Sequence, residues 1–361
     1  MNRKKICYIL PEFREETDSH FSYLYDFINV ISEGADIFLI VEKGNPPIDR
    51  FPKVAFLKRS HVRFLPFRIV EAFFAIIVAR TRGYRIFYTH YSYSGALISS
   101  SVARMTGGTS YYWNCGMPWL YGKQFPLRVV LRMVHYLVTG TVTMRDLYAK
   151  EFTLAREKIV VVPNWIDLSA FVNMQTKKAI RKELKLPIDR KIILFVHRLS
   201  ERKGADKILQ IASLTTDPAA LFVVVGDGPL AKEISRERKR KGLEERVVLL
   251  GKIPHKDIAS YFYAADIFMM PSEEEGFPHV LLEAMASGLP FVAMTVGGVR
   301  DIVPVVLQKY CVKSGDVSSF TERLRDLLRS ERECEEVSHI EREHVKKYDQ
   351  KSIARQFISL F

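Results

Sequence analysis

The sequence predicts an α/β protein built from two doubly wound, Rossmann-like domains that face each other across a cleft. Three observations lead to this class. The chain has 361 residues, roughly two to three times the usual size of a domain, so one hydrophobic core is not expected to hold all of it. Short apolar runs alternate with longer amphipathic stretches. Most of these runs are continuously apolar, which is typical of parallel strands covered by helices on both faces.

Apolar runs rich in β-branched or aromatic residues mark the expected strands. In the first half of the chain they are residues 5–10, 36–41, 54–57, 85–91, 110–113, 141–143 and 159–162. In the second half they are residues 192–196, 221–225, 247–250, 267–270, 291–294 and 310–312. Helical patterns fill most of the gaps, for example residues 21–32, 205–213 and 230–241. This alternation predicts two parallel sheets.

The expected domains are residues 1–170, residues 171–345 and a C-terminal helix in residues 346–361. The boundary is placed in residues 167–177, after the sequence Val162-Pro163-Asn164-Trp165. Residues 348–361 have apolar side chains at helical spacing, which predicts the last helix.

Composition and charge exclude several classes of protein. Disorder and low complexity are excluded because 48% of the residues are hydrophobic. The formal charge of +13 favours an acidic partner, such as phosphate groups, nucleic acid or an anionic membrane surface. The four cysteines lie far apart and form no CxxC pair, so no zinc ribbon or redox motif is expected. A reducing cytoplasm is the simpler compartment.

Two apolar runs were considered as targeting or membrane segments. Residues 6–10 are too few for a signal peptide, and the run ends at Pro11. Residues 72–79 form an apolar run of 8 residues, whereas a transmembrane helix needs about 20. We therefore expect a chain that does not span a membrane, although it can lie against one.

Open α/β sheets bind ligands at the carboxyl ends of their strands. After the expected strand at 192–196, a turn holds Arg198, Lys203 and Gly204. The Arg fork suits a diphosphate, the Lys adds a point charge, and the Gly lets the backbone come close. A solvated basic turn is the alternative. The P-loop pattern GxxxxGK[ST] is absent here.

Two glycine turns follow other expected strands. The sequence Val225-Gly226-Asp227-Gly228-Pro229-Leu230 leads into a helix, with Pro229 suited to a helix start. The sequence Val296-Gly297-Gly298-Val299 again joins a strand to a helix. Either turn can offer backbone N–H groups to a phosphate or a sugar, and either can be an ordinary tight connection.

The most informative segment follows the expected strand at 267–270. Pro278 fits a helix start and Gly288 fits its C-terminal cap. Glu275 then lies in the loop before the helix, where it can accept hydrogen bonds from sugar hydroxyls beside an anion at the helix start. Glu283 lies inside the helix among apolar residues and can accept two ribose hydroxyls. The alternatives are an acidic helix start for Glu275 and a structural hydrogen bond for Glu283, since a buried acid needs a partner.

Taken in order, five motifs resemble those of the retaining family-4 glycosyltransferases of GT-B fold. They read HRLxxxKG, VVGDGP, LxGKIP, DIFMMPSEEEGFPHVLLEAMASGLP and VGG. Glu275 and Glu283 match the E-x7-E motif of that family, and Arg198 and Lys203 match its Arg-x4-Lys pair. The segment VPNWID resembles the family's VPNGVD at the end of the first domain. The resemblance is strong over residues 159–303 and much weaker before them.

The resemblance implies transfer of a sugar from a nucleotide-sugar donor with retained anomeric configuration. Arg198 and Lys203 would neutralise the diphosphate leaving group, Glu275 would orient the donor sugar, and Glu283 would hold the ribose. The remaining donor-binding residues are expected to be Gly228, Ile253, Gly276, Phe277, Pro278, His279 and Val280. No cofactor is implied because the nucleotide sugar is a substrate, and no metal is expected because basic residues neutralise the diphosphate. The last helix of this fold commonly crosses back to the first domain.

The sequence departs from the family pattern at four places. Asp301 stands where family members often have Glu after the double glycine. His197 stands where the family usually has glycine, so its ring is expected to narrow the donor site or to contact the sugar. The active-site histidine of the first domain has no clear match, and Asn114 and His90 are two candidates for that catalytic place. His20 falls where the family usually has a glycine-rich loop that faces the donor phosphates. A histidine at a strand end is also often structural.

The first half is expected to choose the acceptor. Residues 1–170 carry 22 Lys+Arg and 14 Asp+Glu, a net +8, against 32 and 27, a net +5, in the remainder. Basic and large apolar residues interleave in residues 58–68, which lead into residues 69–79, and such a stretch suits a membrane interface. A core helix with a solvated basic face is the alternative. We therefore expect a glycan or lipid-linked acceptor and a peripheral place at the inner face of a membrane.

Three other functions compete with this interpretation. A nucleotide-sugar epimerase on a similar scaffold would bind the same donor without an acceptor. A non-catalytic subunit that binds nucleotide sugars would also keep these motifs. A nucleic-acid binder is disfavoured, because the basic residues are spread along the chain and no nucleic-acid motif is present.

Overall fold

The computed structural model describes residues 3–13, 22–59, 64–122, 124–172 and 175–361. The chain divides into two compact units, one of Met1–Asn164 with Gln350–Phe361 (unit 1) and one of Trp165–Asp349 (unit 2). Unit 1 thus gives way to unit 2 after Asn164, earlier than the expected boundary at residue 170, and the chain returns to unit 1 at Gln350 rather than at residue 346. Each unit holds one parallel sheet, of seven and six strands, which confirms the predicted α/β class.

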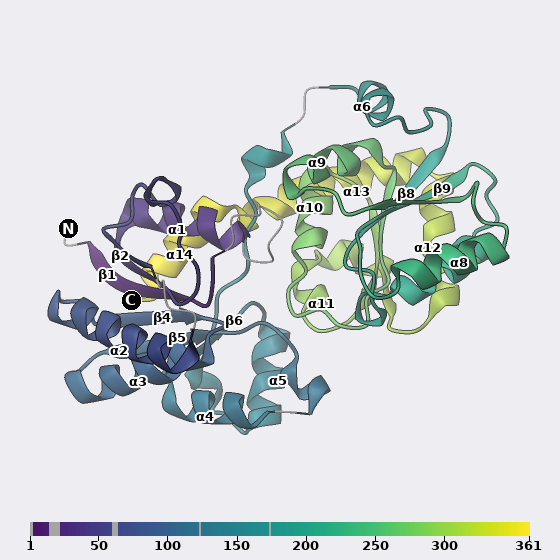
Figure 1. Ribbon diagram of the computed structural model, residues 1–361. Helices are drawn as coiled ribbons and strands as arrows, with labels where there is room; N and C mark the ends of the chain where they lie inside the picture. The colour runs from purple at the N-terminus through teal and green to yellow at the C-terminus, as the bar shows by residue number, and fades with distance from the viewer. Residues whose placement is uncertain (1–2, 14–21, 60–63, 123, 173–174) are drawn as a thin grey trace. The chain divides into compact units, whose positions relative to one another are not determined.

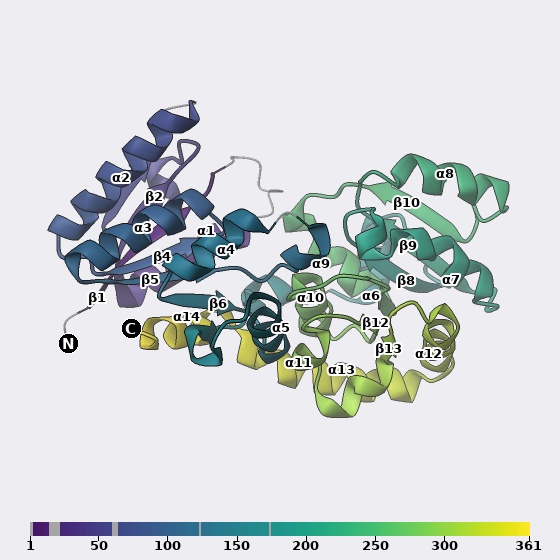
Figure 2. The same cartoon turned by 90° about the horizontal axis from the view of Figure 1, so that it is seen from below.

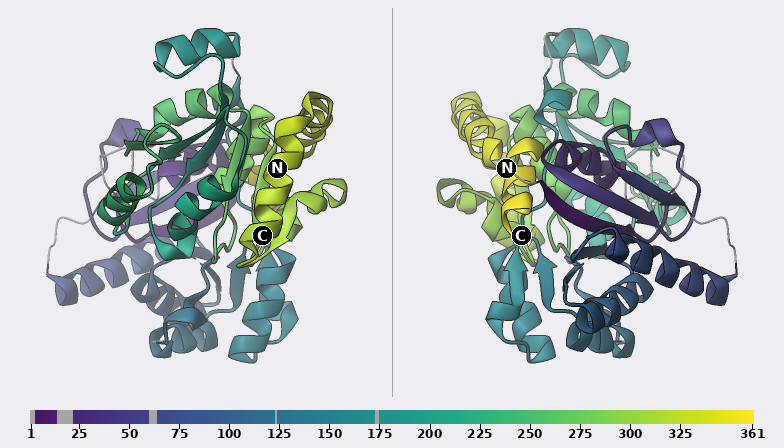
Figure 3. Two further views of the ribbon diagram at one scale, coloured as in Figure 1. Left: turned by 90° about the vertical axis from the view of Figure 1, so that its right-hand side faces the viewer. Right: turned by 90° about the vertical axis from the view of Figure 1, so that its left-hand side faces the viewer.

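The sheet of unit 1 has the strand order β3-β2-β1-β4-β5-β6-β7. Its strands are β1 (Lys4–Leu10), β2 (Ala35–Val41), β3 (Phe56–Arg59), β4 (Ile86–His90), β5 (Thr109–Trp113), β6 (Tyr136–Thr139) and β7 (Ile159–Val161). Its helices are α1 (Ser22–Gly34), α2 (Leu65–Thr81), α3 (Tyr93–Thr106), α4 (Phe125–Met133), α5 (Val142–Phe152) and α14 (Gln350–Ser359). Helices α2 and α3 pack on one face of the sheet, with α4 beside α3, whereas α1 and α14 pack together on the other face (Figure 2 and Figure 3).

The core of unit 1 follows the alternation of side chains along a strand. Cys7 and Ile9 of β1 are buried in the cluster under α2 and α3. Tyr8 points to the opposite face, where its ring lies 6.3 Å from that of Phe357 in α14. The Phe357 ring also packs edge-on against Tyr88 at 4.8 Å. The C-terminal helix therefore completes the core of unit 1, beside α1 (Figure 1).

The sheet of unit 2 has the strand order β10-β9-β8-β11-β12-β13. Its strands are β8 (Lys191–Val196), β9 (Ala220–Val225), β10 (Val247–Gly251), β11 (Ile267–Met270), β12 (Phe291–Thr295) and β13 (Cys311–Lys313). Its helices are α6 (Lys177–Glu183), α7 (Ile208–Leu214), α8 (Ala231–Arg240), α9 (His255–Ala264), α10 (His279–Ser287), α11 (Val299–Ile302), α12 (Val317–Arg329) and α13 (Glu331–Val345). Every residue of β9 is buried, as its continuous apolar run predicts.

Both sheets contain a point where the chain reverses its direction of winding. In unit 2 it lies between the neighbouring strands β8 and β11, and in unit 1 between β1 and β4. The helices that follow the two strands cover opposite faces of the sheet there, and the loops at the carboxyl ends of both strands border the same place. This switch point is where open α/β sheets bind ligands.

Two predicted strands of unit 1 differ from the structure. The strand expected at residues 141–143 is wrong, and the strand at this place is β6, Tyr136–Thr139. Thr141 instead caps α5, because its hydroxyl accepts a hydrogen bond from the N–H of Met144 at 3.1 Å. The strand expected at residues 54–57 begins two residues later, as β3, Phe56–Arg59.

The apolar run at residues 72–79 lies inside the longer helix α2, Leu65–Thr81. Neither α2 nor any other helix in the described part of the chain is long and apolar enough to cross a membrane.

The loops after β8 and β11 approach so closely that one position must be glycine. Gly204 has φ +68°, and a Cβ atom there would lie 1.9 Å from the carbonyl oxygen of Pro271. Gly242 has a similar φ of +62°, but nothing lies within 4 Å of the same atom. We predict that Gly204→Ala lowers the free energy of unfolding by at least about 2 kcal/mol more than Gly242→Ala, measured by urea denaturation. Equal losses would show that only backbone strain, and not the approach to Pro271, requires glycine.

Candidate active site

The loops that follow β8 and β11 are held together at the switch point of unit 2. The backbone N–H groups of Glu273 and Glu274 donate to the carbonyl oxygen of Arg202 at 3.0 and 3.1 Å. The Arg202 guanidinium in turn binds both carboxylate oxygens of Glu274 at 2.7 Å. Such a bidentate pair fixes geometry as well as charge. Two motifs that lie about 70 residues apart in the sequence therefore form one site.

The carboxylate of Glu275 lies between two nitrogen groups of the other loop. Lys203 Nζ is 2.9 Å from Glu275 Oε1, and His197 Nε2 is 3.3 Å from the same oxygen. Lys203 also donates to the carbonyl oxygen of Glu274 at 3.0 Å. The side chain of Glu275 is only 5% exposed. The sequence motifs predict each of these residues in the site but do not indicate that they contact one another.

The protonation states of this group follow from its contacts. Burial raises the pKa of Glu275, but the charge of Lys203 and the hydrogen bond from His197 outweigh burial and bring the pKa to about 2. Burial also lowers the pKa of His197, against the effect of Glu275. The Nδ1 atom of His197 accepts the backbone N–H of Arg198 at 2.8 Å, so the neutral ring carries its hydrogen on Nε2, which lies 3.3 Å from Glu275 Oε1. Glu275 is therefore an anion that accepts hydrogen bonds.

Glu283 has a partner that the sequence analysis missed. It lies in α10, and its Oε1 atom is 3.0 Å from Nε2 of His255. His255 is the first residue of α9, just after β10, and half of its side chain is exposed. The rule that a buried acid needs a partner indicated that such a group exists, but not which one. Ile253, an expected donor-binding residue, is partly exposed in the same loop.

The start of α10 has the expected form. The helix begins at His279 after Pro278 and ends before Gly288, which has φ +64°. Gly276 and His279 are partly exposed, whereas the other expected donor-binding residues here, Phe277, Pro278 and Val280, are buried. Gly276 and His279 thus reach solvent, and the buried residues shape the wall behind them.

The remaining donor-site residues of unit 2 lie on the β8 side. A Cβ atom at Gly228 would lie 2.5 Å from the carbonyl oxygen of Leu199, so this glycine turn packs directly on the loop after β8. Arg198 is exposed, and its guanidinium makes no ion pair with any residue that the structure describes. This free positive charge lies one residue from His197.

His90, a candidate from unit 1, is completely buried at the end of β4. Its Nδ1 atom is 3.0 Å from the hydroxyl of Tyr8, and its ring stacks on Trp113 at 4.1 Å. These contacts correspond to the structural alternative that the sequence left open for a histidine at a strand end.

Asn114, the second candidate from unit 1, lies after β5 and is also buried. Its side chain donates to the Tyr112 hydroxyl at 3.1 Å and accepts from Gly116 N at 2.9 Å and the Tyr148 hydroxyl at 3.0 Å. These bonds satisfy both ends of the amide. The third candidate, His20, lies outside the described residues.

The switch point of unit 1 holds an acid that the sequence analysis did not name. Glu42 directly follows β2 and is buried, and it accepts hydrogen bonds from the hydroxyls of Ser92 at 2.5 Å and Ser94 at 3.3 Å. Burial raises the pKa of this carboxyl group. An acid immediately after an apolar strand was the signal that could have found it.

Comparison with known proteins identifies the domain family of unit 2. Residues 176–352 match the family model described as Glycosyl transferases group 1. This chain carries a group 1 glycosyltransferase domain. It is 31% identical over 206 residues to 2-deoxystreptamine N-acetyl-D-glucosaminyltransferase of Streptomyces fradiae, covering 56% of this chain and 49% of that protein.

A second relative of this chain is UDP-Gal:alpha-D-GlcNAc-diphosphoundecaprenol alpha-1,3-galactosyltransferase of Escherichia coli. The two are 29% identical over 187 residues, which cover 50% of this chain and 48% of that one. The chain thus matches about half the length of these curated relatives. The chain aligns over 99% of both chains with the crystal structure of Anabaena Alr3699/HepE in complex with UDP, with a TM-score of 0.82 and 16% identity. The chain therefore shares the GT-B fold along its whole length.

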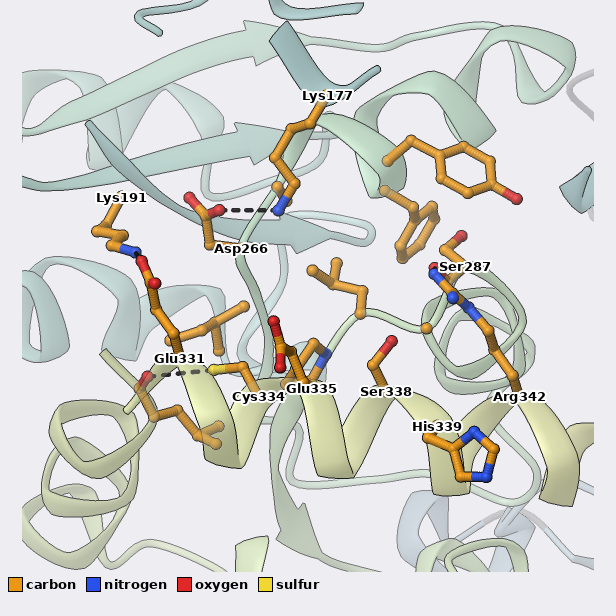
Figure 4. Close-up of a pocket in the computed structure, with 18 of the residues that line it drawn as sticks. Lys177, Lys191, Asp266, Ser287, Glu331, Cys334, Glu335, Ser338, His339 and Arg342 are labelled. Carbon is orange, nitrogen blue, oxygen red and sulfur yellow. Dashed lines mark hydrogen bonds and ion pairs between the residues drawn. The ribbon is translucent and has the colours of Figure 1, made fainter. Parts of the chain in front are cut away.

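A cavity of about 720 Å³ lies at the other end of the glycosyltransferase domain, at the amino ends of β8, β11 and β12. Two ion pairs line it (Figure 4): Lys177 with Asp266 at 2.8 Å and Lys191 with Glu331 at 3.1 Å. It contains none of the residues expected to bind the donor. Among the described residues, no cluster of three or more His, Cys, Asp or Glu side chains is arranged to hold a metal ion.

His197 gives the glycosyltransferase domain a testable pH dependence. We predict that His197→Ala lowers turnover about tenfold, because the Glu275 anion loses a donor, and that His197→Gln restores most of the rate. In the wild type, turnover should fall only at a pH below the ordinary histidine range, because burial lowers the pKa of His197 and a proton on Nδ1 then breaks the bond from Arg198 N–H. Nucleoside diphosphate release against pH measures both effects. An unchanged rate and profile in His197→Ala would remove the ring from the site.

Proposed function

We propose that the chain is a retaining glycosyltransferase that moves a sugar from a UDP- or GDP-sugar to a hydroxyl group of a lipid-linked or cell-surface glycan precursor. The observation that carries this proposal is the buried group of Glu275, Lys203 and His197 at the switch point of unit 2. The name of the Escherichia coli relative, with its UDP-Gal donor and diphosphoundecaprenol acceptor, supports it. The UDP complex of the Anabaena protein, which has the same fold, supports it as well.

The diphosphate is the first group that the site must accommodate. Lys203 and Arg198 would neutralise it and would stabilise the charge that grows on the leaving phosphate in the transition state. Lys203 has three donors, of which Glu275 and the Glu274 carbonyl occupy two. Its third donor, with the free guanidinium of Arg198, would bind the phosphate oxygens. We therefore expect donor binding without added metal ions.

The sugar and the ribose would be bound by the two carboxylates. Glu275 is ionised at neutral pH, so it would accept hydrogen bonds from the donor sugar and would not act as a general acid. Glu283 would accept hydrogen bonds from the ribose hydroxyls, and His255 would position the carboxylate through its contact with Oε1. The His197 ring would border the sugar, where the family usually has only a glycine.

The chemical step is the one that the family resemblance implies. The bond between the anomeric carbon and the phosphate oxygen breaks, and the acceptor oxygen forms its bond on the same face of the sugar. The proton of the acceptor hydroxyl passes to the leaving phosphate. A pair of carboxylates of the glycosidase kind is then not required.

The test is product analysis with labelled UDP- and GDP-sugars, with and without polyprenyl-diphosphate-linked N-acetylglucosamine. The proposal predicts nucleoside diphosphate release that depends on the acceptor and, by NMR, a product with the anomeric configuration of the donor. An interconverted nucleotide sugar in the absence of acceptor would instead establish an epimerase. A product of inverted configuration would contradict the retaining mechanism.

A further inference from the structure

Helix α2 of unit 1 is apolar on the face that points away from the protein. Its inner face is formed by small and branched residues, Ala72, Ala75, Ile76 and Ala79, which are buried. Its outer face exposes large apolar side chains, Phe67, Ile69, Val70, Phe73, Phe74 and Val78, at fractions between 40% and 64%. Surface helices normally present polar residues to solvent. A contiguous apolar patch of this kind marks a contact with something else.

The charged residues of α2 do not interrupt this patch. The residues 67, 70, 74 and 78 recur at three- and four-residue spacing along one line of the helix. Arg68 donates to the carbonyl oxygen of Glu42 at 3.2 Å, Glu71 pairs with Lys58 at 2.8 Å, and Arg80 donates to Thr106. All three charged side chains thus contact other residues of unit 1, and none of them lies on the line of residues 67, 70, 74 and 78.

No described element of unit 1 covers the outer face of α2. The helix packs on α3 and β2 through its inner face, and it is the outermost helix of the row α2–α3–α4 (Figure 2 and Figure 3). The patch continues beyond the start of the helix, because Phe64 is 62% exposed and its ring lies 5.6 Å from that of Phe67.

The surroundings of the patch are strongly basic. Residues 53–85 contain eight Lys or Arg residues and a single acid, Glu71. Large apolar side chains that insert at the headgroup boundary, surrounded by Lys and Arg, are the chemistry that binds anionic lipid. A second copy of the same chain is a poorer occupant, because a symmetric contact would bring two such basic segments together.

We propose that the outer face of α2, with Phe67 and Phe74 at its centre, docks the chain on the surface of an anionic lipid bilayer. The helix lies in the plane of the interface and its apolar face enters the headgroup region. This inference adds a binding surface to the proposed function and names the class of partner. It does not depend on the donor site, which is in the other unit.

The test is flotation of the purified full chain with phosphatidylcholine vesicles and with vesicles that also contain phosphatidylglycerol. The wild type should float with the anionic vesicles, and less so at high salt because salt screens the basic residues. The double variant Phe67→Ser/Phe74→Ser should bind at least about tenfold more weakly, because two apolar anchors are lost. The control Val305→Ser/Val306→Ser removes apolar side chains from unit 2 that are at least as exposed (83% and 64%), and it should bind like the wild type.

A second measurement uses a variant that keeps the patch apolar. Phe74→Trp should show a blue shift of its emission with the anionic vesicles and not with phosphatidylcholine alone. Absence of binding by the wild type, or equal binding by Phe67→Ser/Phe74→Ser, would overturn the proposal. A wild-type dimer in solution that becomes a monomer in the double variant would also overturn it, since α2 would then contact a second copy of the chain. Nucleotide binding, measured on the same preparations, reports separately on the donor site.

Discussion

Replacing Glu275 by Gln should lower the rate of sugar transfer by about 100- to 1,000-fold, the usual effect of removing one preorganised electrostatic group. Gln keeps the shape of the side chain but removes the negative charge that Lys203 and His197 now hold in place. The NH2 group of Gln donates two hydrogen bonds and accepts none, whereas Lys203 needs an acceptor at this place. The measurement is release of nucleoside diphosphate in the presence of acceptor.

The matched control for this prediction lies two residues away. Glu273 is in the same loop, but it pairs with Lys207 at 2.8 Å and accepts a hydrogen bond from Ser314. Glu273→Gln should therefore keep transfer within a few-fold of the wild type. Near-normal turnover by Glu275→Gln in folded protein, or an equal loss in both variants, would contradict the role of Glu275.

Lys203→Ala should weaken the binding of free UDP or GDP by about 30-fold or more, since truncating a partner in a desolvated charge pair costs about 2 kcal/mol or more. Two effects add in this variant. The diphosphate loses a cationic donor, and the buried Glu275 anion loses the charge that balances it. The site then repels the ligand that it is expected to bind. Isothermal titration calorimetry measures the affinity.

Lys207→Ala is the control for Lys203→Ala. Lys207 follows Lys203 by four residues. It pairs with Asp206 at 3.1 Å and with Glu273 at 2.8 Å, and not with Glu275. Its removal should leave nucleotide affinity almost unchanged. An equal loss in both lysine variants would mean that the effect comes from the general positive charge of the loop.

The fold could be predicted largely from local patterns. A parallel strand buried on both faces is continuously apolar, and the runs at β1, β9 and β11 therefore stand out in the sequence. The pattern failed at β6, a strand of four residues whose neighbour Thr141 is also a good β-former. A helix-capping hydrogen bond decided the role of Thr141, and such a bond depends on a backbone geometry that residue type alone does not indicate.

The candidate site could be predicted only as separate parts. Motif order and the E-x7-E spacing identified Glu275, Glu283, Arg198 and Lys203. Their mutual contacts depend on the neighbouring positions of β8 and β11, which are not adjacent in the sequence. His255 could not be assigned to Glu283 for the same reason, because β10 and α10 belong to different crossovers. The apolar side of α2 had a clear pattern, but its exposure is decided by tertiary packing.

The most direct test of the donor site is a thermal-shift panel with UDP, GDP, ADP and their common sugar conjugates, in the absence of metal ions. A ligand at 100 times its dissociation constant stabilises a folded protein by about 2.7 kcal/mol, which such a measurement detects. The proposed function predicts a clear rise in melting temperature with one nucleotide in the wild type and a much smaller rise in Lys203→Ala. No rise with any of these ligands in protein shown to be folded, or an equal rise in Lys203→Ala, would contradict it.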